Sequence, residues 1–163
     1  KDPIMLFFGK TFFEQYKEFA AAMDIPQGDI NGSINLPQVQ LALNLIKEEF
    51  EVEFKDAILK FGESPSRENL VEVADALADT IYVICQLAHV LDIPLDLVYA
   101  EVHANNMTKM GPDGKAIKRE DGKVLKPAGY KPVDLWSLLA KYSDMRACET
   151  GAHGAENWNS PIN

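Results

Sequence analysis

Two acidic stretches decide how this chain folds: residues 47–56 read KEEFEVEFKD, and residues 72–79 read EVADALAD. Each residue of an α-helix advances about 100° around the axis, so Glu49 and Glu53 lie on nearly one face, one turn apart. The second stretch spaces three acids at i, i+3 and i+7, which again forms one stripe: Glu72, Asp75 and Asp79. The spacing predicts two long helices, each carrying a line of carboxylates.

Start and stop signals frame these two helices. Proline is favoured in a first turn, so the first helix is expected from near Pro37 to about Phe61. Residues 62–66, GESPS, form a clear break, and Ser66 is a suitable N-cap for a second helix over 67–91. Three further helices are expected at residues 11–24, 95–110 and 134–142.

The region after the fourth helix changes character. Asp121-Gly122 is the preferred pair for a tight type I′ turn, which predicts a small β-hairpin near residues 115–127. The fold expected is all-α, a four-helix-bundle-like protomer with this one hairpin. Residues 1–143 are expected to form the domain, and residues 144–163 a polar C-terminal tail.

Composition narrows the class of protein. The chain has 163 residues, 47% of them hydrophobic, which suits one folded domain. Its net charge of −9 argues against nucleic-acid binding, which needs a basic surface. No signal peptide or membrane span is expected, because polar residues interrupt the most apolar stretch, 81–99. Cys85 and Cys148 have no metal-site or disulfide spacing, so Cys85 is expected in the core and the compartment is expected to be cytoplasmic.

The acidic stripes have two interpretations. Acidic residues on helices often form a solvated face, and Lys47, Lys55 and Lys60 could pair with those of the first stripe. The second stripe is different, because no basic residue occurs from Glu68 to Cys85 and its neighbours are apolar. Facing carboxylates repel unless divalent cations such as Mg²⁺ or Mn²⁺ lie between them. The two stripes together therefore favour a metal site.

At these residues the chain resembles the MazG-like and phosphoribosyl-ATP pyrophosphohydrolase-like group of all-α nucleoside triphosphate pyrophosphohydrolases. The family pattern is Glu-Glu-x-x-Glu on one helix and Glu-x-x-Asp on the next. Glu48 and Glu49 open the first motif, but the third position is Val52, and Glu53 follows as though one residue were inserted. Glu51 is a weaker candidate.

The second motif allows two registers. Glu72-x-x-Asp75 matches the pattern literally, whereas Asp79 precedes a Thr-Ile-Tyr segment similar to the one that follows the family's aspartate. In that second register Ala76 would replace the glutamate. The resemblance therefore implies a metal-ligand set drawn from both helices: Glu49, Glu53, Glu72, Asp75 and Asp79.

A further block, near residues 101–132, resembles a branch of the same family in which the helix ends in Asn-Met-Ser/Thr-Lys and a Gly-Lys-Val-x-Lys-Pro segment follows. Lysines there suit phosphate oxygens, and asparagines can contact phosphate, sugar or base. The expected substrate-binding residues are Asn105, Asn106, Lys109, Lys123, Lys126 and Tyr130. The expected catalytic residues are Glu48, Glu49 and Lys109.

The resemblance implies hydrolysis of (deoxy)nucleoside triphosphates to the monophosphate and pyrophosphate, with two or more Mg²⁺ or Mn²⁺ ions per site. It also implies a homodimer or a tetramer built from dimers. Phosphoribosyl-ATP and dUTP are alternative substrates on the same fold. A non-catalytic nucleotide-binding helical dimer and a structural metal-binding bundle are alternatives of a different class.

Overall fold

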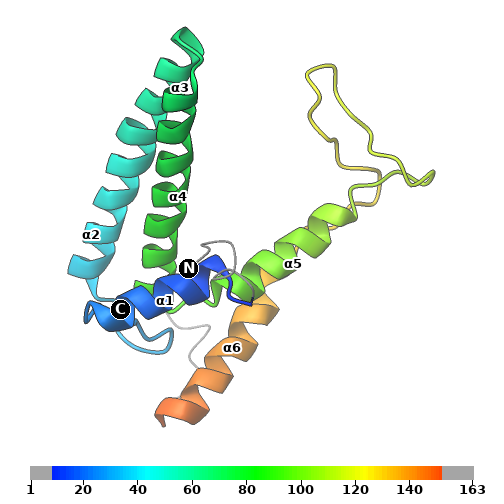
Figure 1. The fold of residues 1–163 in the computed structure, drawn as a ribbon. Coiled ribbons are helices and arrows are strands. Elements are labelled where there is room, and N and C mark those ends of the chain that lie inside the picture. The colour runs from blue at the N-terminus through cyan, green and yellow to red at the C-terminus, as the bar shows by residue number, and fades with distance from the viewer. Residues whose placement is uncertain (1–8, 152–163) are drawn as a thin grey trace.

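A computed structural model of the chain describes residues 9–151, and this part of the chain is all-α (Figure 1). Its helices are α1 (Phe12–Ala22), α2 (Leu36–Ile46), η2 (Lys47–Phe54), α3 (Lys55–Glu63), α4 (Arg67–Val90), α5 (Leu95–Met107) and α6 (Leu135–Thr150). The element η2 is a π-helical segment that joins α2 to α3 without a break, so residues 9–151 contain five continuous helices.

Side-chain caps explain where the helices begin. The Ser66 hydroxyl accepts a hydrogen bond from the Asn69 N–H at 3.1 Å, which confirms the expected N-cap of α4. Thr11 and Glu14 form a reciprocal capping box at the start of α1. These local contacts satisfy N–H groups that have no partner inside the helix.

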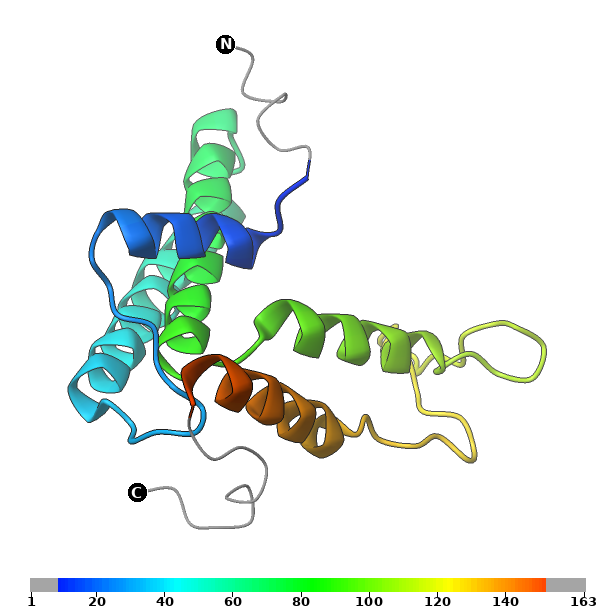
Figure 2. The same ribbon diagram turned by 90° about the horizontal axis from the view of Figure 1, so that it is seen from below.

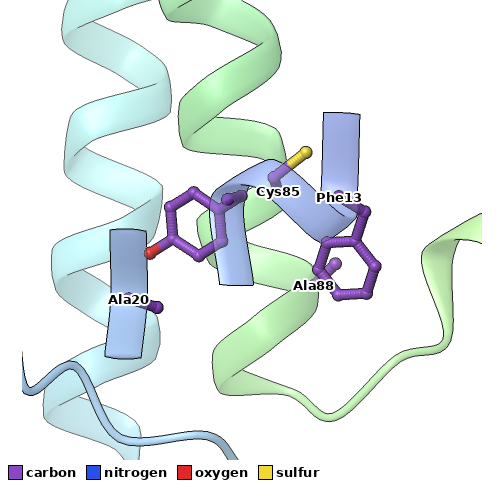
Figure 3. Packing of buried hydrophobic residues seen from close by; sticks show 5 residues of the cluster. Phe13, Ala20, Cys85 and Ala88 are labelled. Atoms are coloured by element: carbon purple, nitrogen blue, oxygen red, sulfur yellow. The ribbon is translucent and has the colours of Figure 1, made fainter. Parts of the chain in front are cut away.

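Helix α4 is the centre of the fold. The continuous helix α2–η2–α3 runs antiparallel to it, and α1 crosses both (Figure 1). Figure 3 shows Phe13 and Ala20 of α1 beside Cys85 and Ala88 of α4, in a cluster that also contains the fully buried Tyr16. The expectation that Cys85 is a core residue is confirmed, because only 2% of it is exposed.

A second, smaller cluster holds the other end of this helical pair together. Ala57 of α3 packs with Val73 and Ala76 of α4, and Phe54 and Phe61 lie partly buried against them. Alanine at the contact lets the two helices approach closely. The acidic stripes flank this seam, so the packing sets the distance between them.

The described residues do not close into a four-helix bundle, in contrast to the prediction. Helix α5 leaves α4 at a bend of 114° and pairs with α6 instead, so the two helical pairs point apart (Figure 2). Within residues 9–151 no single helix has the length and apolar character needed to cross a membrane, although α4 and α5 would pass by length and composition if counted as one bent span.

The predicted β-hairpin is wrong. The turn at Asp121-Gly122 forms, with the Gly122 N–H donating to the Arg119 carbonyl at 2.9 Å. However, only two isolated antiparallel bridges occur nearby, and no strand forms between residues 9 and 151. The residues around the turn are mostly exposed, and a two-stranded ribbon without a buried apolar face is marginal in water.

Helix α6 extends further than the predicted end at residue 142, so residues 144–150, assigned from the sequence to a polar tail, are helical. A buried carboxylate holds this extension: Asp92, 2% exposed, accepts from Arg146 Nε at 2.9 Å and from Tyr142 Oη at 2.8 Å. Its other donors are Gln27 and the Ile30 N–H. The remaining part of the predicted tail, residues 152–163, lies outside the described residues.

Candidate active site

A cavity of about 270 Å³ lies between the α2–η2–α3 helix and α4. All five residues predicted as metal ligands line it: Glu49, Glu53, Glu72, Asp75 and Asp79. The remaining lining residues are Asp56, Ala57, Lys60 and Ala76. The two helices that carry the acidic stripes pack antiparallel, so carboxylates as far apart in the chain as Glu49 and Asp79 line one pocket.

Glu49 lies close to other carboxylates of this pocket. Partial desolvation raises the pKa of its carboxyl above the usual value, and the negative charges of Asp79, Glu53, Glu48 and Asp75 raise the pKa further, in that order. Each neighbouring carboxylate disfavours the ionised form of Glu49. A bound cation would have the opposite effect, so the pocket has a physical reason to attract one.

Lys60 forms an ion pair with Glu72 across the pocket, with the Lys60 ammonium 2.7 Å from both carboxylate oxygens. The sequence had suggested only that Lys60 could pair within its own helix. The structure directs it to α4 instead, because residue 60 falls on the flank of α3 that faces the cavity.

Two charged lining residues, Asp56 and Lys60, were not among the site residues predicted from the sequence. Asp56 ends the quoted acidic stretch and follows Glu53 by three residues, so helical spacing could have placed it on the same stripe. Glu48, predicted as a catalytic acid, is exposed and does not line the cavity, although its charge acts on Glu49.

The side chains fit a hard divalent cation by chemistry. Six carboxylates supply only oxygen donors, which Mg²⁺ and Mn²⁺ prefer, and their mutual repulsion is relieved by a positive ion. As the side chains stand, no three Asp, Glu, His or Cys residues among those described are close enough together to hold one ion. Metal binding would therefore require rotamer changes, and Glu72 could contribute only after its release from Lys60.

A separate cavity of about 460 Å³ lies at the far end of α5, lined by residues of the segments 105–112 and 127–131. Tyr130 donates its hydroxyl hydrogen bond to Asn105 Oδ1, and Asn105 Nδ2 donates to the Lys131 carbonyl at 2.8 Å. The Lys109 and Lys126 ammonium groups lie 5.7 and 5.1 Å from the centre of the Tyr130 ring. These predicted substrate-binding residues thus form one cluster.

Two other residues were predicted to bind substrate: Asn106 lies beside this cluster, and Lys123 lies in the turn at Asp121-Gly122. Asn106 Oδ1 accepts a hydrogen bond of 2.6 Å from Lys109 Nζ. Lys123 belongs to the turn, where its backbone N–H donates to Asp121 and its carbonyl accepts from Arg119. We name the segment from Lys109 to Lys131 the basic loop.

The basic loop and the acidic cavity are not neighbours within one chain. The two cavities share no lining residue. In both Figure 1 and Figure 2, α5 carries the loop away from the α2–α4 pair. Helix geometry puts about 16 Å of α4 between Asp79 and Val90 and about 18 Å of α5 after the bend, so lysine side chains at the end of α5 do not reach the acids.

The fold and the cavity define an all-α protein whose carboxylates converge from two antiparallel helices. Residues 14–106 match the family model for phosphoribosyl-ATP pyrophosphohydrolase, and the chain belongs to that family. It is therefore a pyrophosphohydrolase that acts on phosphoric anhydrides of nucleotides. A comparison with curated proteins finds no match. The matched region contains both acidic stripes but ends before Lys109, so the basic loop lies outside it.

Proposed function

We propose that this protein hydrolyses nucleoside triphosphates, in ribo or deoxy form, to the nucleoside monophosphate and pyrophosphate. The observation that carries the proposal is the single cavity that gathers both acidic stripes in a nucleotide pyrophosphohydrolase of this family. Family members are generally Mg²⁺-dependent. Glu49, Glu53, Asp75 and Asp79 would hold two or more Mg²⁺ or Mn²⁺ ions, which would neutralise phosphate charge and acidify a bound water.

The protein's own residues divide the remaining work. Glu49, surrounded by other carboxylates, is placed to accept the proton of the attacking water. Glu72 joins the ligand set when Lys60 turns away from it. Lys60 then becomes available for a phosphate oxygen at the mouth of the same cavity, where its positive charge offsets charge that develops on the leaving group.

The active assembly proposed is a homodimer, or a tetramer built from dimers, in which the basic loop of one copy reaches the acidic cavity of another. Three observations support it. Within one chain the loop lies far from the cavity (Figure 1). The loop is basic and the cavity acidic, so their charges are complementary. The Lys109 and Lys126 ammonium groups both lie within 6 Å of the centre of the Tyr130 ring, so the loop presents two positive charges that could bind phosphate.

Exposed apolar side chains support the same assembly. The α2–η2–α3 helix and α4 leave many large apolar residues exposed, and patches of this kind mark interaction surfaces. They include Phe50, Val52, Leu70, Val71, Leu77, Ile81 and Ile84. A second copy covering this face would supply the helices that one chain lacks for a closed bundle.

The test is a panel of ribo- and deoxyribonucleoside triphosphates with Mg²⁺ or Mn²⁺, with products separated by chromatography. We expect pyrophosphate and the monophosphate in equal amounts. Release of inorganic phosphate instead, or no turnover with any nucleotide, would contradict the proposal. Nucleotide-dependent stabilisation without turnover would point to a non-catalytic nucleotide-binding dimer, and stabilisation by metal alone to a structural metal-binding bundle.

Phosphoribosyl-ATP is a second candidate substrate, favoured by the name of the matched family. It belongs in the same panel, together with dUTP. Because the acidic cavity recognises the phosphates alone, the choice among these substrates depends on residues that contact the base and sugar. A preference of at least about tenfold in kcat/KM, or about 1.4 kcal/mol, would decide it.

A further inference from the structure

The π-helical segment η2 lies at the acidic cavity and interrupts an otherwise regular helix from Leu36 to Glu63. A π turn closes its hydrogen bond over five residues where an α turn uses four. Such a segment therefore accommodates extra residues without rotating the helix that follows. Segments of this kind are rare and occur often at functional sites.

If residues 36–63 formed a regular α-helix throughout, the inward-facing positions before and after the middle of η2 would point in different directions around the helix axis. The buried or half-buried positions before the middle of η2 are Gln38, Val39, Ala42, Leu45, Ile46 and Glu49. Those after it are Phe54, Ala57 and Phe61. Counted at about 100° per residue, the mean directions of the two sets differ by about 100°, which is the rotation of one residue. Both sets nevertheless pack against the same helix, α4.

We propose that η2 contains one residue more than a regular helix needs here, and that its π geometry absorbs that residue so that α2 and α3 both pack against α4, with Glu53 rather than Val52 lining the acidic cavity. The inference rests on the proposed function only for the role of the cavity as a metal site. The packing of α2 and α3 against α4 does not depend on that role. The extra residue also explains the irregular acid spacing, because Glu53 lines the cavity whereas Val52, 51% exposed, does not.

The proposal has an unusual consequence for deletions. Deleting Val52 should convert η2 into regular α-helix, move Glu53 to the position of Val52, and leave α2 and α3 in phase on α4. Deleting Ala78 is the matched control, since Ala78 is also exposed and apolar and does not line the acidic cavity. Helix α4 is α-helical throughout, so losing Ala78 rotates Asp79 by about 100° relative to Asp75.

The experiment compares the full chain with these two deletion variants by circular dichroism, thermal unfolding and calorimetric titration with Mn²⁺ alone. We expect the Val52 deletion to keep the helical content and to bind Mn²⁺ within about threefold of the parent, and the Ala78 deletion to bind at least about tenfold more weakly or to unfold. A Val52 deletion that unfolds or loses Mn²⁺ like the control overturns the proposal. Equal tolerance of both deletions also overturns it, because no register would then be maintained.

The experiment distinguishes failure of the proposed function from failure of the inserted-residue proposal. If the parent chain neither binds Mn²⁺ nor turns over any nucleotide, the metal site is refuted, while the unfolding measurements still decide the question of register. A Val52 deletion that melts cooperatively within a few degrees of the parent, beside an unfolded Ala78 deletion, supports the inserted residue in that case as well.

Discussion

Lys60 of α3 and Glu72 of α4 form an ion pair across the acidic cavity, with the ammonium nitrogen 2.7 Å from both carboxylate oxygens. The two side chains are 55% and 49% exposed, so the pair adds only about 0–1 kcal/mol to stability. The ion pair matters because Lys60 competes with the proposed metal ions for the carboxylate of Glu72.

Replacing Lys60 with glutamine should therefore tighten metal binding. Removing one positive charge near the site is expected to raise the affinity for Mn²⁺ about fivefold, the effect of roughly 1 kcal/mol of charge repulsion in a water-exposed site. Calorimetric titration measures it. Lys55→Gln is the control, since Lys55 is exposed on the same helix and does not line the cavity. Equal affinities in the two variants would contradict the proposed competition.

Asp75→Asn should strongly reduce metal-dependent turnover. Asp75 is an exposed lining residue, so the variant is expected to keep its helical content while Mn²⁺ affinity falls at least about tenfold and pyrophosphate release about 100-fold. Glu68→Gln serves as the matched control on α4, because Glu68 is exposed and lies outside the cavity. Unchanged turnover in Asp75→Asn would remove that residue from the mechanism.

Subunit mixing tests whether the basic loop acts on another copy. Chains with Asp75→Asn and chains with Lys109→Ala and Lys126→Ala should each be inactive alone. Mixed by unfolding and refolding together, they should recover about a quarter of the parental activity, because half of the dimers are mixed and each has one intact site. No recovery, from two variants that each refold and dimerise, would show that acids and lysines act within one chain.

Asp92 should make the packing of α6 against the rest of the fold sensitive to acid. Burial alone would raise the pKa of Asp92, but hydrogen bonds from Arg146, Tyr142, the Ile30 N–H and Gln27 outweigh burial and hold the pKa below its usual value. A lowered pKa in the folded state stabilises the fold above the unfolded-state pKa of about 3.9, and this contribution is lost as the pH falls through the lower, folded-state value.

The measurement for this prediction is urea unfolding of the parent and of Asp92→Asn between pH 2 and pH 7. At neutral pH the variant should lose about 3 kcal/mol, because Arg146 keeps its charge without the buried partner. The parent should lose stability below about pH 4, and the variant should show a weaker dependence over the same range. If the free energies of unfolding of the two proteins changed with pH in the same way, Asp92 would not be the source of the acid sensitivity.

Much of the fold follows from local signals. Ser66 ends a break rich in Gly, Pro and Ser and caps α4 with its own side chain, so the start of that helix is predictable without tertiary contacts. The end of α6 is not, since residues 144–150 read as polar chain. They remain helical because Arg146 reaches Asp92, which lies more than fifty residues earlier in the sequence.

The acidic site likewise has features that the local sequence predicts and features that depend on tertiary packing. Periodicity predicted five of the six carboxylates that line the cavity, because positions one turn apart share a helix face whatever the helix packs against. The pairing of Lys60 with Glu72 and the inclusion of Asp56 depend on how far α3 rotates against α4. The spacing of the sequence indicated one inserted residue near Val52, and the π geometry of η2 shows where the helix accommodates it.

The sequence by itself determined the helices, the family and the set of acidic residues, since each depends on spacing along the chain. Only the tertiary structure decided how these parts meet: that α5 turns away from α4 by 114°, that it carries the lysines away from the acids, and that α6 is held by a buried ion pair. The reason is physical, because contacts between distant residues depend on packing angles and on buried charges finding partners, and helical periodicity contains neither.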